Sequence, residues 1–180
     1  MPKTSELLSA ARLGDSAAEA RLFTALYTDL RRLAHSRLKR SEPCTLLDTT
    51  ALVHEAYLRF RKAGYGRIQD RSHFLAYAAA AMRSIVVDFI RSRRVVRRDG
   101  ADAALLPDPS SLLRGEREIL QVDKALEELS AANPRLVKVV EMRYFAGMKE
   151  TEIASALSVT ERTVRRDWEK ARMLLAAALR

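Results

Sequence analysis

The stretch GMKETEIASALSVTERTVRRDWEKARMLLAAALR, residues 147–180, predicts two helices joined by a tight turn. Each segment spaces its apolar residues as the buried face of a helix does: Ile153, Ala154 and Leu157 in the first, and Val164, Trp168, Ala171 and Leu175 in the second. The turn Ser158-Val159-Thr160 separates them, and Thr160 is placed to cap the second helix. This order is typical of a helix-turn-helix.

The exposed face of the second helix is rich in cations. It carries Arg162, Thr163, Arg165, Arg166 and Lys170. Such side chains suit phosphates and guanine edges in a major groove. We therefore predict that this face binds duplex DNA. An ordinary helical hairpin with a solvated basic face is the alternative that spacing alone leaves open.

Composition agrees with an anionic partner. The chain of 180 residues has 32 Lys and Arg against 23 Asp and Glu, a formal charge of +9. This balance favours nucleic acid first, with a membrane surface or an acidic protein behind it. The apolar share of 48% is ample for packed cores.

Several classes of site are excluded. The single cysteine, Cys44, rules out an intramolecular disulfide and a cysteine-clustered zinc site. The histidines His35, His54 and His73 lack metal-ligand spacing, so we expect no metal and no cofactor. The N-terminus does not resemble a signal peptide, and no apolar run approaches the ~20 residues of a membrane span. We expect a cytoplasmic protein with no membrane partner.

The fold class predicted for the whole chain is all-α, because alternating strand patterns are scarce. Asn133-Pro134 is a typical helix start, and Gly147 a typical stop. The stretch DGADAALLPDPSSLLRG, residues 99–115, has no sustained periodicity and contains two prolines. We expect two small helical domains, 1–96 and 116–180, joined by a flexible linker over 97–115.

Three stretches resemble one family, the bacterial sigma factors. LVKVVEMRYFAGMKETEIASALSVTERTVRRDWEKAR, residues 136–172, is similar to their promoter-reading C-terminal domain. ALVHEAYLRF, residues 51–60, resembles their polymerase-binding helix. FLAYAAAAMRSIVVDFIRSRR, residues 74–94, resembles the helix that opens and reads the minus-10 element. The short two-domain chain resembles the extracytoplasmic-function (ECF) group over about residues 16–178.

The resemblance implies a factor that is not an enzyme and that directs core RNA polymerase to promoter DNA. The helix carrying Arg162 to Lys170 would read the minus-35 element. The minus-10 element would be read as single-stranded DNA, with Ser84 at a position that faces a captured base in relatives. The minus-10 candidates are Tyr65, Arg67, Arg71, Phe74, Arg83, Ser84, Arg91 and Arg94. For Phe74 and Tyr77 a place in the core is an equal alternative.

The polymerase-binding helix departs from the family pattern D-A-E-D-L-V-Q-E. Its candidate contacts to the clamp helices of the largest polymerase subunit are Asp48, Thr50, Ala51, His54 and Glu55. Thr50 stands where Glu is common and Ala51 where Asp is common, so this face has lost acidic charge.

Two interpretations of this loss remain open. Either the face docks weakly, with Thr49 or Thr50 capping the helix, or a Ser/Thr protein kinase restores charge by phosphorylating Thr50 or, as second choice, Thr49. An anti-sigma protein is a further candidate regulator. A helix-turn-helix regulator that binds duplex DNA without polymerase, and a basic helical adaptor for RNA or protein, are the competing functions.

Overall fold

The computed structural model describes residues 4–39, 47–64, 68, 70–98 and 109–180. Within its helices, the side chains of residues 36, 37, 39, 94–98 and 109–114 lie outside the described set. The described residues form helices and connecting turns without a strand, as the all-α prediction requires. The elements are α1 (Thr4–Arg12), α2 (Ser16–Lys39), α3 (Thr49–Ala63), α4 (Arg71–Arg98), α5 (Pro109–Ala132), α6 (Pro134–Val140), the π-helical turn η1 (Glu141–Phe145), α7 (Glu150–Leu157) and α8 (Glu161–Ala178).

Local capping accounts for most boundaries of α1 to α3. Gly14 lies between α1 and α2 and has a φ of +88°, a backbone conformation that glycine adopts readily because it has no Cβ. Asp15 Oδ1 accepts hydrogen bonds from the amides of Ala17 and Ala18 at 2.9 and 3.0 Å, which caps α2. Gly64, with φ of +74°, ends α3.

The cap of α3 is Asp48. Its Oδ1 accepts a hydrogen bond from the amide of Ala51 at 2.8 Å. The interpretation that Thr49 or Thr50 caps this helix is therefore wrong. A carboxylate at this position also interacts favourably with the positive end of the helix dipole.

The C-terminal half follows its sequence signals closely. Asn133 caps α6, and Pro134 occupies the first helical turn. One feature was not predicted: α6 continues into the π-helical turn η1 before Gly147 reverses the chain with φ of +63°. Such a turn shifts the side chains that follow it around the helix axis.

The helices extend into the expected linker from both sides. Helix α4 continues to Arg98, and α5 already begins at Pro109, a residue suited to a first helical turn. Residues 97–98 and 109–115, at the two ends of the predicted linker, are therefore helical. Residues 99–108 of that linker lie outside the described residues.

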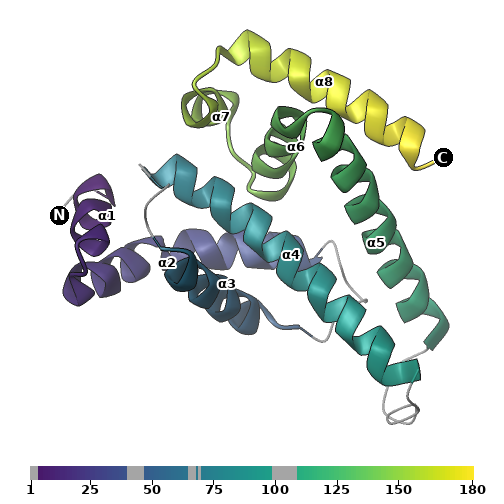
Figure 1. The fold of residues 1–180 in the computed structure, drawn as a ribbon, viewed down its shortest axis with the longest axis horizontal. Coiled ribbons are helices and arrows are strands. Elements are labelled where there is room, and N and C mark those ends of the chain that lie inside the picture. Colours follow the sequence, from purple (N-terminus) through teal and green to yellow (C-terminus); the bar gives the residue numbers. More distant parts are fainter. Residues whose placement is uncertain (1–3, 40–46, 65–67, 69, 99–108) are drawn as a thin grey trace.

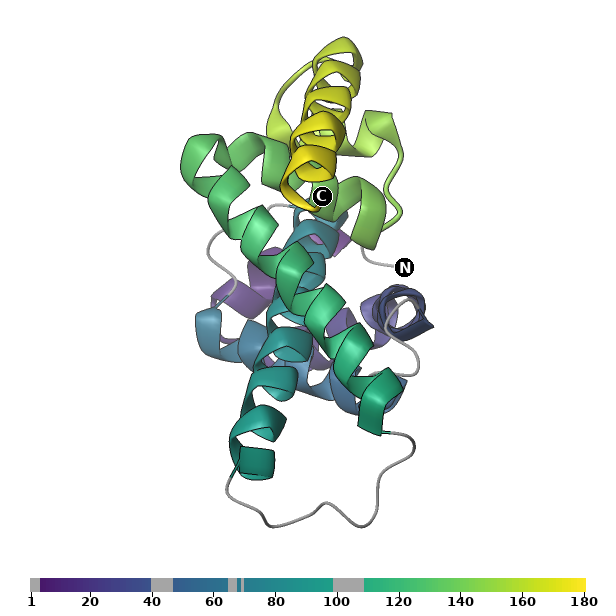
Figure 2. The same ribbon diagram turned by 90° about the vertical axis from the view of Figure 1, so that its right-hand side faces the viewer.

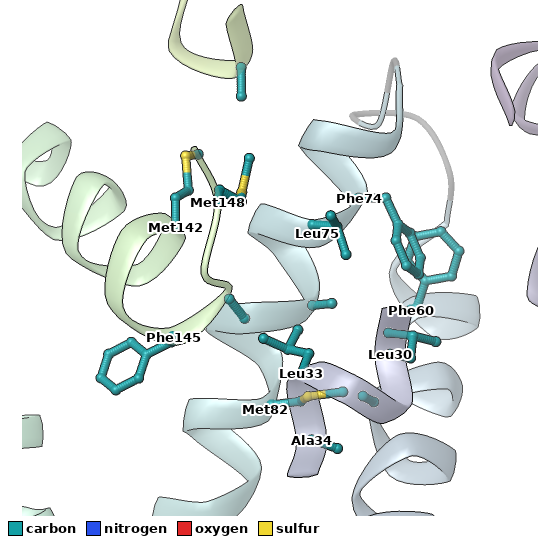
Figure 3. Close-up of a cluster of buried hydrophobic side chains, with 14 of the residues drawn as sticks. Leu30, Leu33, Ala34, Phe60, Phe74, Leu75, Met82, Met142, Phe145 and Met148 are labelled. Atoms are coloured by element: carbon teal, nitrogen blue, oxygen red, sulfur yellow. The ribbon is translucent and has the colours of Figure 1, made fainter. Parts of the chain in front are cut away.

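Figures 1 and 2 show that α5 runs alongside α4, with α6, α7 and α8 gathered at one end of the pair. The buried side chains of the two halves belong to one hydrophobic cluster. In Figure 3, Met142 and Met148 of the C-terminal half lie to the left of α4, whereas Phe60 and Leu30 lie to its right; all four belong to one hydrophobic cluster. Helix α4 therefore packs on both halves.

The expectation about membrane-spanning segments needs a correction. By length and composition alone, Arg71–Arg93 of α4 could cross a membrane. However, 50% of its apolar window is buried within the protein. Because α2, α3, α5 and η1 all contact α4, its apolar character is accounted for by packing.

Replacing Met82 by Ala tests the central position of α4. The Met82 side chain is completely buried, so its removal should leave a cavity and lower the free energy of unfolding by about 2–5 kcal/mol. Urea denaturation followed by circular dichroism measures this change. Leu58→Ala, at a position that is 55% exposed on α3, is the control and should cost much less. Equal losses in the two variants would contradict the central role of α4.

Candidate nucleic-acid interface

Helices α7 and α8 are joined by a tight turn at the place where a helix-turn-helix was predicted. Ser158 adopts a left-handed conformation with φ of +53° and ends α7. Thr160 then caps α8, because its Oγ1 accepts a hydrogen bond from the amide of Thr163 at 3.2 Å. Ile153 of α7 and Val164 of α8 are fully buried. The turn and the buried contacts together set the angle at which α8 leaves the domain.

The cationic face of α8 is exposed. Four of its predicted contact residues have exposed side chains: Arg162, Arg165, Arg166 and Lys170. Thr163 is half-buried, and its hydroxyl lies 3.0 Å from that of Thr160. The structure thus brings the cations together on one helix surface, while the Thr163 hydroxyl takes part in the cap.

Asp167 lies on the buried side of α8. It is buried, and its Oδ2 accepts a hydrogen bond of 2.6 Å from Nε of Arg135 on α6. Its burial and its ion pair make it a structural residue that ties α8 to α6.

Arg165 belongs to a network that sequence analysis missed. Glu150, at the start of α7, accepts a hydrogen bond of 2.6 Å from Nε of Arg165 and another of 2.6 Å from Nη1 of Arg143. The guanidinium of Arg143 in turn lies 5.1 Å from the ring centre of Trp168. These partners are seven and fifteen positions apart in sequence, so no local periodicity indicates the contact.

The residues predicted to read the minus-10 element differ in their exposure. Ser84 is exposed on α4, and its hydroxyl accepts a hydrogen bond of 3.0 Å from Arg59. Phe74 is only 4% exposed and packs edge-on against Phe60, so in this structure it is a core residue that cannot stack on a base. Tyr65, Arg67 and the side chain of Arg94 lie outside the described residues.

The three remaining minus-10 candidates are arginines held by carboxylates. Arg71 forms two hydrogen bonds of 2.8 Å with Asp29 and lies 3.4 Å from Glu152. These contacts raise the pKa of Arg71, chiefly through the hydrogen bonds to Asp29. Arg71 is therefore positively charged, and its hydrogen-bond donors are engaged by Asp29 and Glu152 within the protein.

Arg83 and Arg91 contact acidic residues of the C-terminal half. Arg83 Nη1 lies 2.8 Å from Asp123 of α5, and its Nε lies 3.0 Å from Glu141 of η1. Arg91 reaches the second oxygen of Asp123 at 3.2 Å and Glu127 at 3.7 Å. We call Arg83, Arg91, Asp123 and Glu141 the α4 ion-pair cluster. It joins the two halves of the chain across the α4–α5 contact.

The candidate polymerase-binding residues share one side of α3. Asp48, Thr50, Ala51 and His54 are exposed, whereas Glu55 is half-buried. Glu55 lies 3.4 Å from Arg59, whose guanidinium also contacts Asp88 of α4 at 2.9 Å. The exposed part of this face therefore carries a single acidic side chain, Asp48, among the candidates.

Among the described residues, no group of three or more His, Cys, Asp or Glu side chains is placed to hold a metal ion.

A search of curated proteins found no match for the chain. A family model described as ECF sigma factor matches residues 1–180. Members of this family are transcription initiation factors that act with core RNA polymerase and promoter DNA. Because the match spans all of these helices, the chain belongs to the ECF sigma factor family.

Proposed function

We propose that the protein is an alternative sigma factor in which α8 reads the minus-35 element, the exposed part of α4 contacts the minus-10 element, and α3 binds the clamp helices of core polymerase. The observation that carries this proposal is the exposed cationic face of α8, presented on a helix-turn-helix, in a chain matched by the ECF family model along its length. Such a protein works in the cytoplasm, where polymerase and promoters are found.

The arrangement of α8 supports base reading rather than general charge attraction alone. Arg166 is 71% exposed, and its nearest carboxylate, Asp167, lies 3.7 Å away and is engaged by Arg135. A guanidinium so placed has donors available for a guanine edge or a phosphate. By contrast, the apolar side chains of α8 face α6 and α7 and hold the helix in position.

The polymerase-binding face motivates a regulatory part of the proposal. Thr50 is exposed at the second position of α3, whereas Thr49 is half-buried at the first. Because Asp48 already caps the helix, the Thr50 hydroxyl is not needed for capping. A phosphate on Thr50 would add about −1.5 to −2 charge beside the positive end of the helix. We propose that a Ser/Thr kinase activates the protein at Thr50 in this way.

An anti-sigma protein is the alternative regulator. It would act by occupying the same α3 and α8 surfaces, and it would require no modification of Thr50. The two mechanisms differ in whether the unmodified protein already binds core polymerase tightly.

Run-off transcription tests the main proposal. The protein and core RNA polymerase, given promoter fragments selected from the source genome, should produce specific transcripts that neither produces alone. Arg166→Ala should weaken binding of the minus-35 duplex by about 1–3 kcal/mol if a base contact is lost. Lys124→Ala, which removes an exposed cation from α5, is the charge-matched control and should transcribe as the wild type does.

Two outcomes would contradict the proposal. Equal affinity for promoter and scrambled DNA, in the wild type and in Arg166→Ala alike, would overturn the assignment of α8. Tight, dimeric binding to duplex DNA with no complex with core polymerase would instead favour a helix-turn-helix regulator that is not a polymerase subunit.

Binding to core polymerase tests the kinase part. Thr50→Glu should bind core polymerase more tightly than the wild type, since it restores a negative charge at the start of α3, whereas Thr50→Ala should not. Thr49→Glu is the matched control for charge at the adjacent position. The switch is wrong if unmodified protein binds core polymerase tightly and Thr50→Glu gains nothing.

A further inference from the structure

We propose that Glu150 is a positioning residue for base reading: its carboxylate orients Arg165 so that the guanidinium addresses one guanine of the minus-35 element. This inference rests on the proposed function of α8. It assigns a role in promoter specificity to a negatively charged side chain at the edge of a DNA-binding surface.

The geometry restrains Arg165 from behind. Glu150 Oε2 lies 2.6 Å from Nε of Arg165, the donor closest to the stem of the side chain. The terminal nitrogens extend beyond this contact, with Glu161 at 3.7 Å from Nη2. An arginine contacts guanine O6 and N7 with two donors at once, which requires a defined guanidinium plane. Fixing Nε sets that plane before DNA arrives.

The carboxylate itself is held in place. Arg143 donates to Glu150 Oε1 at 2.6 Å, and the Arg143 guanidinium lies over the Trp168 ring. Hydrogen bonds from Arg165 and then Arg143 lower the pKa of Glu150, so that it stays ionised below the usual range. Both oxygens of Glu150 therefore have cationic partners, and Arg165 is one end of a chain of contacts that runs through Glu150 and Arg143 to Trp168.

The sign of the charge separates this role from simple DNA attraction. A carboxylate near phosphates lowers affinity for any DNA sequence by repulsion. Removing it should therefore leave non-specific affinity unchanged or higher while discrimination falls. A residue that only stabilised the fold would lower both quantities together.

The test uses a minus-35 duplex selected from a random library by the holoenzyme, and variants in which each guanine pair is replaced singly. Glu150→Gln should reduce discrimination at one guanine by about fivefold or more, with affinity for mixed-sequence duplex unchanged or raised. Glu128→Gln removes the same charge from an exposed position of α5 and should change neither.

A double variant shows whether Glu150 acts through Arg165. In an Arg165→Lys background, which keeps the charge but loses the planar fork, Glu150→Gln should have no further effect on discrimination. The inference is overturned if Glu150→Gln discriminates as well as the wild type does. It is also overturned if Glu150→Gln lowers discrimination in the Arg165→Lys background as much as it does in the wild type. If the wild type fails to discriminate, the proposed function fails instead. If Glu150→Gln lacks a helical circular dichroism spectrum, Glu150→Asp replaces it, with a smaller loss at the same guanine expected.

A second inference rests on different residues. We propose that the observed packing of the two halves is an autoinhibited state, in which the α4 ion-pair cluster occupies arginines that would otherwise bind the minus-10 strand. A carboxylate and a phosphate compete for the same guanidinium donors. DNA therefore has to displace Asp123 and Glu141 from Arg83 and Arg91.

Three members of the cluster are enclosed, whereas the side chain of the fourth, Arg91, is 54% exposed. Asp123 is 6% exposed and Glu141 is 7% exposed, and the Arg83 side chain between them is 20% exposed. The apolar contact between the halves includes Met142 and Met148, which belong to the same buried hydrophobic cluster as Met82 of α4. If one ion pair broke while the apolar contact stayed closed, a buried charge would be left without its partner. We therefore expect the ion pairs and the apolar contact to open together.

The substitution Asp123→Asn tests this state in the protein without polymerase. Asp123→Asn should bind oligothymidylate about fivefold or more tightly than the wild type, and its radius of gyration from small-angle X-ray scattering should rise. Glu128→Gln lies on the same helix outside the cluster and serves as the charge-matched control. Affinity that rises equally in both variants would be a charge effect and would overturn the inference.

Unchanged affinity and an unchanged radius of gyration in Asp123→Asn would also overturn it. Should Asp123→Asn fail to fold, as judged by circular dichroism, Glu141→Gln is the second variant and should give the same two changes. These assays contain no polymerase, so their failure is distinct from failure of promoter-directed transcription.

Discussion

The burial of α4 on two sides is the constraint on which the rest of the structure depends. Met82 and Ile90 are completely buried, and the small side chains of Ala78 and Ala79 allow neighbouring helices to approach. Helices α2 and α3 take one side, and α5 and η1 take the other. Since α3 carries the proposed polymerase face, and η1 leads into the α7–α8 pair that carries the proposed DNA face, both proposed surfaces are positioned from α4.

This packing explains why the cations of α4 and α8 differ in availability. The part of α4 next to α5 contacts buried carboxylates, so Arg83 and Arg91 are engaged within the protein. Helix α8 packs through an apolar face and a single buried acid, Asp167, which Arg135 neutralises. The cations of α8 itself are exposed to solvent, although Arg165 also pairs with Glu150. Net positive charge is therefore a poor guide to the DNA-binding surface without the contacts of each arginine.

Much of the fold could be predicted because its signals are local. Asn133, Thr160 and Gly147 act at the helix ends where the sequence places them, since caps need only neighbouring backbone groups. The position of Phe74 could not be predicted, because its cause is non-local. Base stacking and a place in the core were equal alternatives; Phe60 covers the ring, and burial depends on which helix packs opposite. The helix start at Pro109, by contrast, has a local signal, since proline suits the first turn of a helix.

By itself, the sequence determined the helices, the helix-turn-helix and the resemblance to sigma factors, because these depend on spacing and on residues close together in the chain. Only the tertiary structure decided which arginines are available. Asp123, a partner of Arg83, and Asp29, the main partner of Arg71, lie 40 and 42 positions away, and Glu150 lies 15 positions before Arg165. Periodicity reports the face of a helix on which a charge lies. Which opposite charge pairs with it depends on how the other helices pack.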